Sequence, residues 1–180
     1  MAPAGIQSEL QRMFIPANHF KEGSTHPTAN TVNNSPVYDF DPDAKQWLHG
    51  TIHVPLNWKA NSDMFAYPIF CSDLNVLGNI RWGMEYIGLQ RGISIAATVV
   101  NIEKTIPCNG TATIIPTKPY WLTLEGGRIL AGGEPLFQQD KFTSVVHIPI
   151  IVFRDGASEL DNHTGLGRLH GLAVVYEAFI

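Results

Sequence analysis

Residues 46–54 read Gln-Trp-Leu-His-Gly-Thr-Ile-His-Val and alternate between apolar and polar side chains. In an extended chain Leu48, Ile52 and Val54 lie on one face, and a tryptophan, two histidines and a threonine lie on the other. This alternation is typical of a strand that is buried on one side. Pro55 follows directly, and the strand is predicted to end there because proline cannot donate to the ladder of a central strand.

The chain after Pro36 repeats this kind of pattern without repeating the sequence itself. Short runs rich in apolar and β-branched residues are separated by Gly, Pro, Asn and Asp, the residues that turns require. Further strands are predicted at 64–71, 78–89, 97–106, 111–115, 128–131, 143–153 and 169–179. About eight or nine short strands with no helix between them favour an all-β antiparallel sandwich or barrel.

The first 35 residues differ from the rest, because prolines and asparagines interrupt regular structure there. One short run has apolar residues at i, i+4, i+7 and i+8, which is one face of a helix. These residues are Ile6, Leu10, Met13 and Phe14. A helix over 6–14 would be marginal alone, so it would have to dock on a neighbouring protein or cap the core of its own domain. We therefore predict an extended N-terminal arm over 1–35 and a β-sandwich body over 36–180.

Composition and charge exclude several functional classes. The 180 residues include 44% apolar but only 16% charged residues, below the roughly 25% of an ordinary soluble domain, which suggests that partners cover part of the surface. The net charge is −4 and no basic cluster occurs, so nucleic-acid binding is not expected. No apolar run is long enough for a membrane span, and the first twenty residues lack the pattern of a secretory signal. We expect synthesis in a cytoplasm.

The candidate metal-binding patterns do not fit the requirements of a metal ion. His49 and His53 share a face, but four residues of a strand separate them by ~13 Å, whereas zinc holds each ligand at ~2.1 Å. The segment 39–43, Asp-Phe-Asp-Pro-Asp, opens like a calcium loop. Ala and Gly occupy the positions where that loop needs Gly and Glu, so a polar turn is expected instead. The acidic residues of 154–167 are expected in a solvated hairpin tip.

No pattern of residues predicts catalysis. There is no G-x-S-x-G elbow and no Gly-rich phosphate cradle, so neither enzymatic activity nor a cofactor is expected. Cys71 and Cys108 are interpreted as reduced thiols, although a disulfide between them stays open. Large aromatics more often anchor cores or interfaces than sugars, but a sugar site is the alternative for the four tryptophans. These are Trp47, Trp58, Trp82 and Trp121.

Several segments, taken in order, resemble a known group of proteins. They are Phe14-Ile15-Pro16-Ala17, Tyr38-Asp39-Phe40-Asp41-Pro42, Val54-Pro55-Leu56-Asn57-Trp58, Ile80-Arg81-Trp82-Gly83-Met84-Glu85-Tyr86, Ile151-Val152-Phe153-Arg154-Asp155 and Arg168-Leu169-His170-Gly171-Leu172-Ala173-Val174-Val175-Tyr176. The chain thereby resembles small β-sandwich proteins of tailed phages and their prophage relatives. In that family a DFDP turn, a P-x-x-W strand end, an aromatic W-G strand, a V-x-R-D strand and a final R-L-x-G strand follow in this order. The chain departs from the family pattern at 6–14 and at 118–133.

The resemblance implies a fold and a function. Such proteins are jelly-roll modules of the virion, found as head decorations, head fibres or tail-tip components, and are commonly trimeric with no active site. We therefore expect a non-enzymatic capsid decoration, or cement, protein of a virion. It would form a homotrimer and bind the major capsid protein or another virion protein through the apolar residues of its arm. Trp82 and Tyr86 are expected to face a partner. The alternative is a receptor- or glycan-binding module of a head fibre or tail tip.

Overall fold

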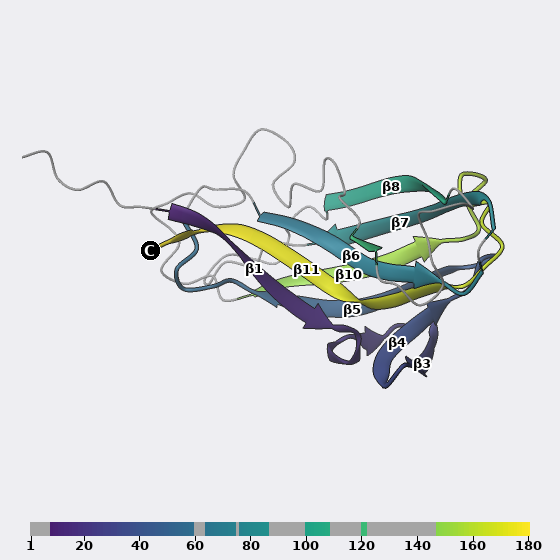
Figure 1. Cartoon of the computed structure of the whole chain (residues 1–180), viewed down its shortest axis with the longest axis horizontal. Helices are drawn as coiled ribbons and strands as arrows, with labels where there is room; N and C mark the ends of the chain where they lie inside the picture. Colours follow the sequence, from purple (N-terminus) through teal and green to yellow (C-terminus); the bar gives the residue numbers. More distant parts are fainter. Residues whose placement is uncertain (1–7, 60–63, 75, 87–99, 109–119, 122–146) are drawn as a thin grey trace, which may run out of the picture.

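Two antiparallel β-sheets packed face to face make up the described part of the chain (Figure 1). The structure, a computed structural model, describes residues 8–59, 64–74, 76–86, 100–108, 120–121 and 147–180. Within these ranges there is no α-helix, only one 3-10 turn, η1 (Ala17–His19), and so no helix that could cross a membrane. The predicted all-β sandwich is confirmed.

Eleven strands are described, and they divide between two sheets. Their bounds are β1 (Ser8–Pro16), β2 (Lys21–Glu22), β3 (Thr28–Val32), β4 (Ser35–Phe40), β5 (Lys45–His53), β6 (Met64–Ser72), β7 (Gly78–Tyr86), β8 (Val100–Cys108), β9 (Tyr120–Trp121), β10 (His147–Asp155) and β11 (Gly167–Phe179). Sheet A has the order β3-β4-β11-β6-β9, with β1 also paired to β11. Sheet B has the order β2-β5-β10-β7-β8. The strands predicted at 111–115 and 128–131 lie outside the described residues.

The strands from β4 to β11 pair in a nested order. β7 pairs with β8, β6 with β9, β5 with β10, and β4 with β11, all antiparallel. This is the pairing of one long ribbon folded back on itself at β7 and β8. Two further pairings, β11 with β6 and β10 with β7, join the pairs into the two sheets. Strands that follow one another, such as β4, β5 and β6, therefore mostly alternate between sheets.

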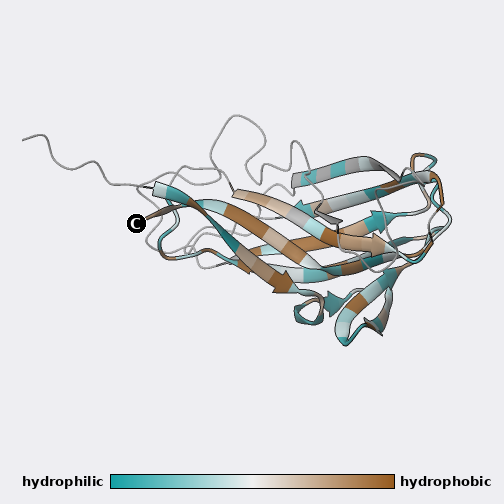
Figure 2. Ribbon diagram, in the orientation of Figure 1, coloured by the Kyte–Doolittle hydropathy of each residue, from teal (hydrophilic) through white to brown (hydrophobic). Residues whose placement is uncertain are grey.

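The core lies between the two sheets and follows the predicted alternation. On β5, Leu48 and Ile52 are fully buried while His49, Thr51 and His53 are exposed. Long hydrophobic stretches run along the central strands β10 and β11 in Figure 2. Side chains that alternate on strands of both sheets therefore meet in one hydrophobic core.

Trp82 and Tyr86 are core residues, which corrects the prediction that they face a partner. Their side chains are 0% and 1% exposed. Both lie on the inward face of β7, and the Trp82 ring packs against Phe40 and Phe70 with ring centroids 5.0 and 5.1 Å apart. The prediction was wrong because sequence alternation identifies the two faces of a strand but not which face meets the second sheet.

The N-terminal segment is a strand, so the predicted helix over 6–14 is wrong for the described residues 8–14. All nine residues of β1 pair with β11, from Ser8 opposite Phe179 to Pro16 opposite Gly171. A helix this short is marginal alone, whereas pairing with β11 satisfies one whole edge of backbone groups. Because β2 and β3 also belong to the sheets, the described part of 1–35 is not a separate arm. Ile6 lies outside the described residues.

Candidate partner-binding site

The predicted partner-binding residues on β1 divide between its two faces. Leu10 and Phe14 point outward and are 74% and 50% exposed, whereas Met13 packs against the core. Within the described ranges β1 pairs only with β11, so its other edge carries backbone groups without a strand partner. Such an edge is a template for an added strand, and two exposed apolar side chains beside it favour a protein contact.

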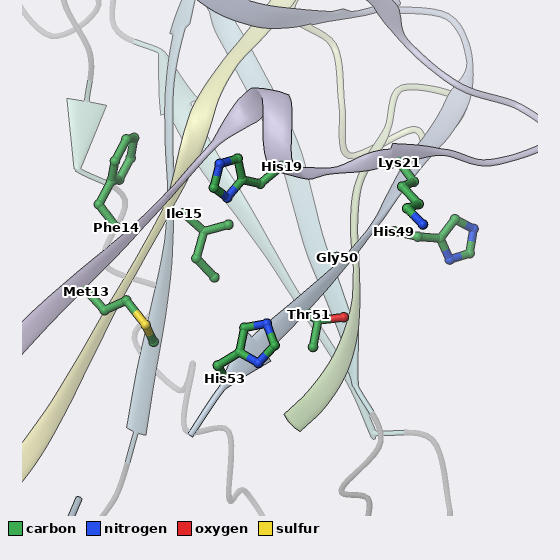
Figure 3. Close-up of a pocket in the computed structure, with 9 residues that line it drawn as sticks. All are labelled: Met13, Phe14, Ile15, His19, Lys21, His49, Gly50, Thr51 and His53. Carbon is green, nitrogen blue, oxygen red and sulfur yellow. The ribbon is translucent and has the colours of Figure 1, made fainter. Parts of the chain in front are cut away.

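A groove of about 480 Å³ runs along the flank of the sandwich beside this edge (Figure 3). It lies between β1 and η1 on one side and β5 on the other. The lining residues come from four elements, β1, η1, β2 and β5. They are Met13, Phe14, Ile15, His19, Lys21, His49, Gly50, Thr51 and His53.

The groove exists because η1 carries the chain from sheet A to sheet B. β2 covers the edge of β5 only at His49 and Leu48, and within the described ranges no strand pairs with that edge at residues 50–52. The buried ring of Phe20 closes the groove toward the core and lies over Gly50. A Cβ on Gly50 would stand 2.7 Å from Phe20 Cε1, which is too close for two carbon atoms. The Phe20 ring can therefore occupy this position only because residue 50 is glycine.

The polar lining of the groove carries one positive charge, on Lys21, and no negative charge. Lys21 and three histidines face it, and none of its lining residues is acidic, although the chain as a whole has a net charge of −4. In the described ranges no three His, Cys, Asp or Glu side chains are placed to hold a metal ion. The three histidines therefore do not make a metal centre. The groove instead suits an extended partner segment that carries carboxylates.

Arg154 and Asp161 form a buried polar centre at the end of the sandwich that carries the loop between β10 and β11. Arg154 is fully buried, and its Nε and Nη2 donate to Asp161 Oδ2 and Oδ1 at 2.8 and 2.7 Å. It also donates to the backbone carbonyls of Phe40, His163 and Gly165. The solvated hairpin tip expected over 154–167 is therefore wrong for Asp161, which is 7% exposed. An arginine directly after the apolar run of residues 148–153 was the signal in the sequence for this centre.

His163 belongs to the same loop and is also buried. Its Nδ1 accepts a hydrogen bond from the Gly165 N–H at 3.0 Å. Burial, and to a lesser extent the nearby Arg154 guanidinium, lower the pKa of His163 below its ordinary value. The neutral imidazole is therefore the form that the folded chain prefers.

Among the described residues, Cys71 and His170 are the two side chains that most resemble a nucleophile and its base. Cys71 Sγ lies 3.4 Å from His170 Nε2, and burial together with Arg168 lowers the pKa of the histidine. A thiol and an imidazole at this distance are parts of a nucleophilic dyad. Cys71 is 0% exposed, however, so a substrate has no access to it. The side chain of Cys108 lies outside the described part of the chain, so the pairing left open for the two cysteines stays open.

The acidic segment 39–43 is a polar turn between β4 and β5, as predicted. Asp39 accepts hydrogen bonds from Arg168 Nε at 3.1 Å and from Asn30 Nδ2 at 2.7 Å. Asp41 Oδ1 accepts from the Asp43 N–H at 2.7 Å. These carboxylates therefore hold the turn and neighbouring strands in place.

No protein-family model matches the chain, and no curated protein matches it either.

Proposed function

We propose that this sandwich is a jelly roll and that the chain is a non-enzymatic structural protein of a tailed-phage virion, a capsid decoration protein. The nested pairing of β4 through β11 carries the first part of the proposal. A two-sheet jelly roll of eight strands is built from such a wrapped ribbon, and this architecture is common in viral capsid domains. The nesting supports the fold that the sequence resemblance implies.

The motifs of the resemblance lie at structural junctions, which gives them a physical role. Asp39 of the DFDP turn and Arg168 of the final strand form an ion pair between β4 and β11. Arg154 of the V-x-R-D strand is the buried centre of the β10–β11 loop. Trp58 of the P-x-x-W segment is buried and bridges to Ala178 near the C-terminus. Residues that lock strand ends suit a rigid module on the outside of a particle.

Attachment to the particle occurs through β1 and the groove rather than through a detached arm. An extended segment of a neighbouring virion protein, such as the major capsid protein, can add as a strand to the outer edge of β1. Leu10 and Phe14 would pack on that segment, and Lys21 in the groove would receive its carboxylates. The chain assembles as a homotrimer in this proposal, with contacts that do not include the buried Trp82 and Tyr86.

The test is to find the protein on purified particles. Electron cryomicroscopy of virions that carry the chain, compared with virions that lack it, should show extra threefold-symmetric density on the head shell. Light scattering of the purified chain should give the mass of a trimer. Absence of the chain from purified particles, measured by mass spectrometry, would reject a structural role in the virion.

Glycan recognition at a head fibre or tail tip is the second candidate, and the position of one tryptophan favours it. Trp58 and Trp82 are buried, whereas Trp47 is partly exposed and lines a hollow on the outer face of sheet B. The side chain of Trp121 lies outside the described part. Density confined to the tail tip or a fibre would support this candidate over capsid decoration.

A further inference from the structure

Apolar side chains gather on the face of sheet B that points away from the core. Trp47 on β5 lies opposite Phe153 on β10, and Phe153 lies opposite Gly83 on β7. Because Gly83 has no side chain, the Phe153 ring lies flat over it, and a Cβ there would stand 2.2 Å from the ring. The edge of the Trp47 indole lies against Gly23. A Cβ on Gly23 would stand 2.5 Å from Cδ1 and Nε1 of Trp47. The result is an aromatic floor in which Phe153 is 1% exposed and Trp47, which is partly exposed, is the ring that a ligand can reach.

The next row across the same strands is of mixed character. Ile151 on β10 lies between His49 on β5 and Glu85 on β7. Neighbouring strands are about 4.8 Å apart, so the imidazole and the carboxylate stand roughly 10 Å from each other across the isoleucine. This row places two polar groups at the border of the aromatic floor.

Two hollows open over these rows. One of about 310 Å³ is lined by Lys45, Trp47, Glu85, Ile151 and Phe153. The other, of about 290 Å³, is lined by His49, Gly50, Glu85, Tyr86, Pro149, Ile150 and Ile151. They adjoin, since Glu85 and Ile151 line both. Each is near the lower end of the roughly 300–1,000 Å³ typical of ligand pockets.

The charges around the hollows limit the kind of ligand. Lys45 Nζ is already engaged, 4.3 Å from the centre of the Phe153 ring and 3.8 Å from Asp155 Oδ2. Glu85 makes no ion pair with any residue that the structure describes, and it is half-buried, with Ile151 and Asn101 opposite it on the neighbouring strands. A carboxylate in this state is an acceptor for hydroxyl donors. One lysine is too little positive charge for a nucleic-acid backbone.

The geometry points to a saccharide-binding site in these two hollows, with Trp47 stacking on a sugar ring and Glu85 accepting hydrogen bonds from its hydroxyls. An uncharged sugar ring combines an apolar face with hydroxyl groups around its rim, and this matches an aromatic floor bordered by a carboxylate and an imidazole. The two adjoining hollows fit successive rings of one oligosaccharide. This assignment rests on the second candidate function, glycan recognition, and is independent of attachment through β1.

The experiment is a glycan array of neutral and acidic bacterial oligosaccharides, probed with the labelled full-length chain and with variants. The chain should bind neutral oligosaccharides, with the dissociation constant of the best one measured by titration calorimetry. Trp47→Ala removes the stacking ring and Glu85→Gln removes the charge that strengthens the hydrogen bonds, and each should weaken that binding at least about tenfold. Phe179→Ala removes an exposed aromatic from sheet A and should leave binding unchanged.

The outcomes separate the site from the function. If the array shows no saccharide binding at all, glycan recognition and this site both fail. If the chain binds but Glu85→Gln and Trp47→Ala bind as well as the original, the function stands and the site assignment is overturned. Glu85→Gln keeps the shape of the side chain, so its binding can be compared in a chain whose circular dichroism spectrum and melting temperature match the original. Preferential binding of acidic oligosaccharides, unaffected by Glu85→Gln, would also overturn the assignment.

Discussion

Arg154 and Asp161 form an ion pair in which neither side chain is exposed to solvent, with Nη2 and Oδ1 2.7 Å apart. The pair joins the end of β10 to the loop that leads into β11. A buried charge is costly unless it is paired and hydrogen-bonded, and here the guanidinium also donates to three backbone carbonyls. The loop between the two central strands is therefore held by charge and hydrogen bonds as well as by apolar contacts.

Removing Asp161 should be among the most destabilising single changes on the surface loops. Asp161→Ala leaves the Arg154 charge buried without its carboxylate, which we expect to lower the free energy of unfolding by about 3–5 kcal/mol. Urea denaturation followed by circular dichroism measures the loss. Glu159→Ala, which removes an exposed acid of the same loop, should change stability by less than about 0.5 kcal/mol. Equal small losses for the two variants would contradict a structural role for the pair.

Mild acid should destabilise the fold through two histidines. Burial lowers the pKa of His163 and of His170, so below about pH 6.5 the unfolded chain takes up protons that the folded chain does not. The stability that comes from keeping these two histidines neutral is fully present above that pH. It is lost as the pH falls from there through their lowered pKa values. The free energy of unfolding, measured at steps between pH 7.5 and 5, should fall on acidification. The pH dependence should be shallower in the variant His163→Asn, and an unchanged slope would argue against His163 as the source.

At Gly171 the backbone of β11 lies close against the backbone of β1. A Cβ at this position would stand 2.4 Å from the backbone oxygen of Ile15, which cannot move away as a side chain can. Gly171→Ala should therefore push β1 from β11 and cost about 1–3 kcal/mol, with faster proteolysis within 8–16. Gly167→Ala on the same strand meets only side chains, at 3.2 Å and beyond, and should cost less. Chemical denaturation and limited trypsin digestion compare the two, and a larger loss for Gly167→Ala would speak against the close approach at Gly171.

The exposed apolar residues of β1 should matter for assembly and not for folding. Because Leu10 and Phe14 are largely exposed, the double variant Leu10→Ser, Phe14→Ser should keep its stability within about 1 kcal/mol. Occupancy on particles, measured by quantitative mass spectrometry of purified virions, should fall at least tenfold, the factor that corresponds to about 1.4 kcal/mol of binding. Leu160→Ser, a single exposed apolar residue of the β10–β11 loop, is the matched control. Full occupancy of the double variant would place the contact elsewhere.

The strands of the body could be predicted from the sequence because their alternation is regular. The strand predicted over 46–54 is β5 shifted by one residue, and the strand predicted over 64–71 is β6 one residue short. β1 was missed because its apolar residues also fit a helical spacing over so short a segment. The segment forms a strand and not a helix because it pairs with the edge of β11. Local periodicity does not reveal a pairing with a strand that is distant in the sequence.

The candidate sites depended on pairings between distant residues. Trp82 and Trp47 are similar residues on alternating strands, yet one fills the core and the other lines an outer hollow, because only the stacking of the sheets decides which face is inside. The strand predicted over 143–153 ended before Arg154, which is in fact part of β10, and its partner Asp161 is supplied by a loop that folds back.

The order of apolar and polar side chains by itself determined that this chain forms strands and located β5, β6, β7, β8, β10 and β11 among those described, since each strand needs one face for the core. Which edges pair, which tryptophan stays near solvent and which charges meet inside were decided only by the wrapping of the ribbon into two sheets. Those contacts join residues far apart in the chain, and their free energy exists only when both sheets are in place.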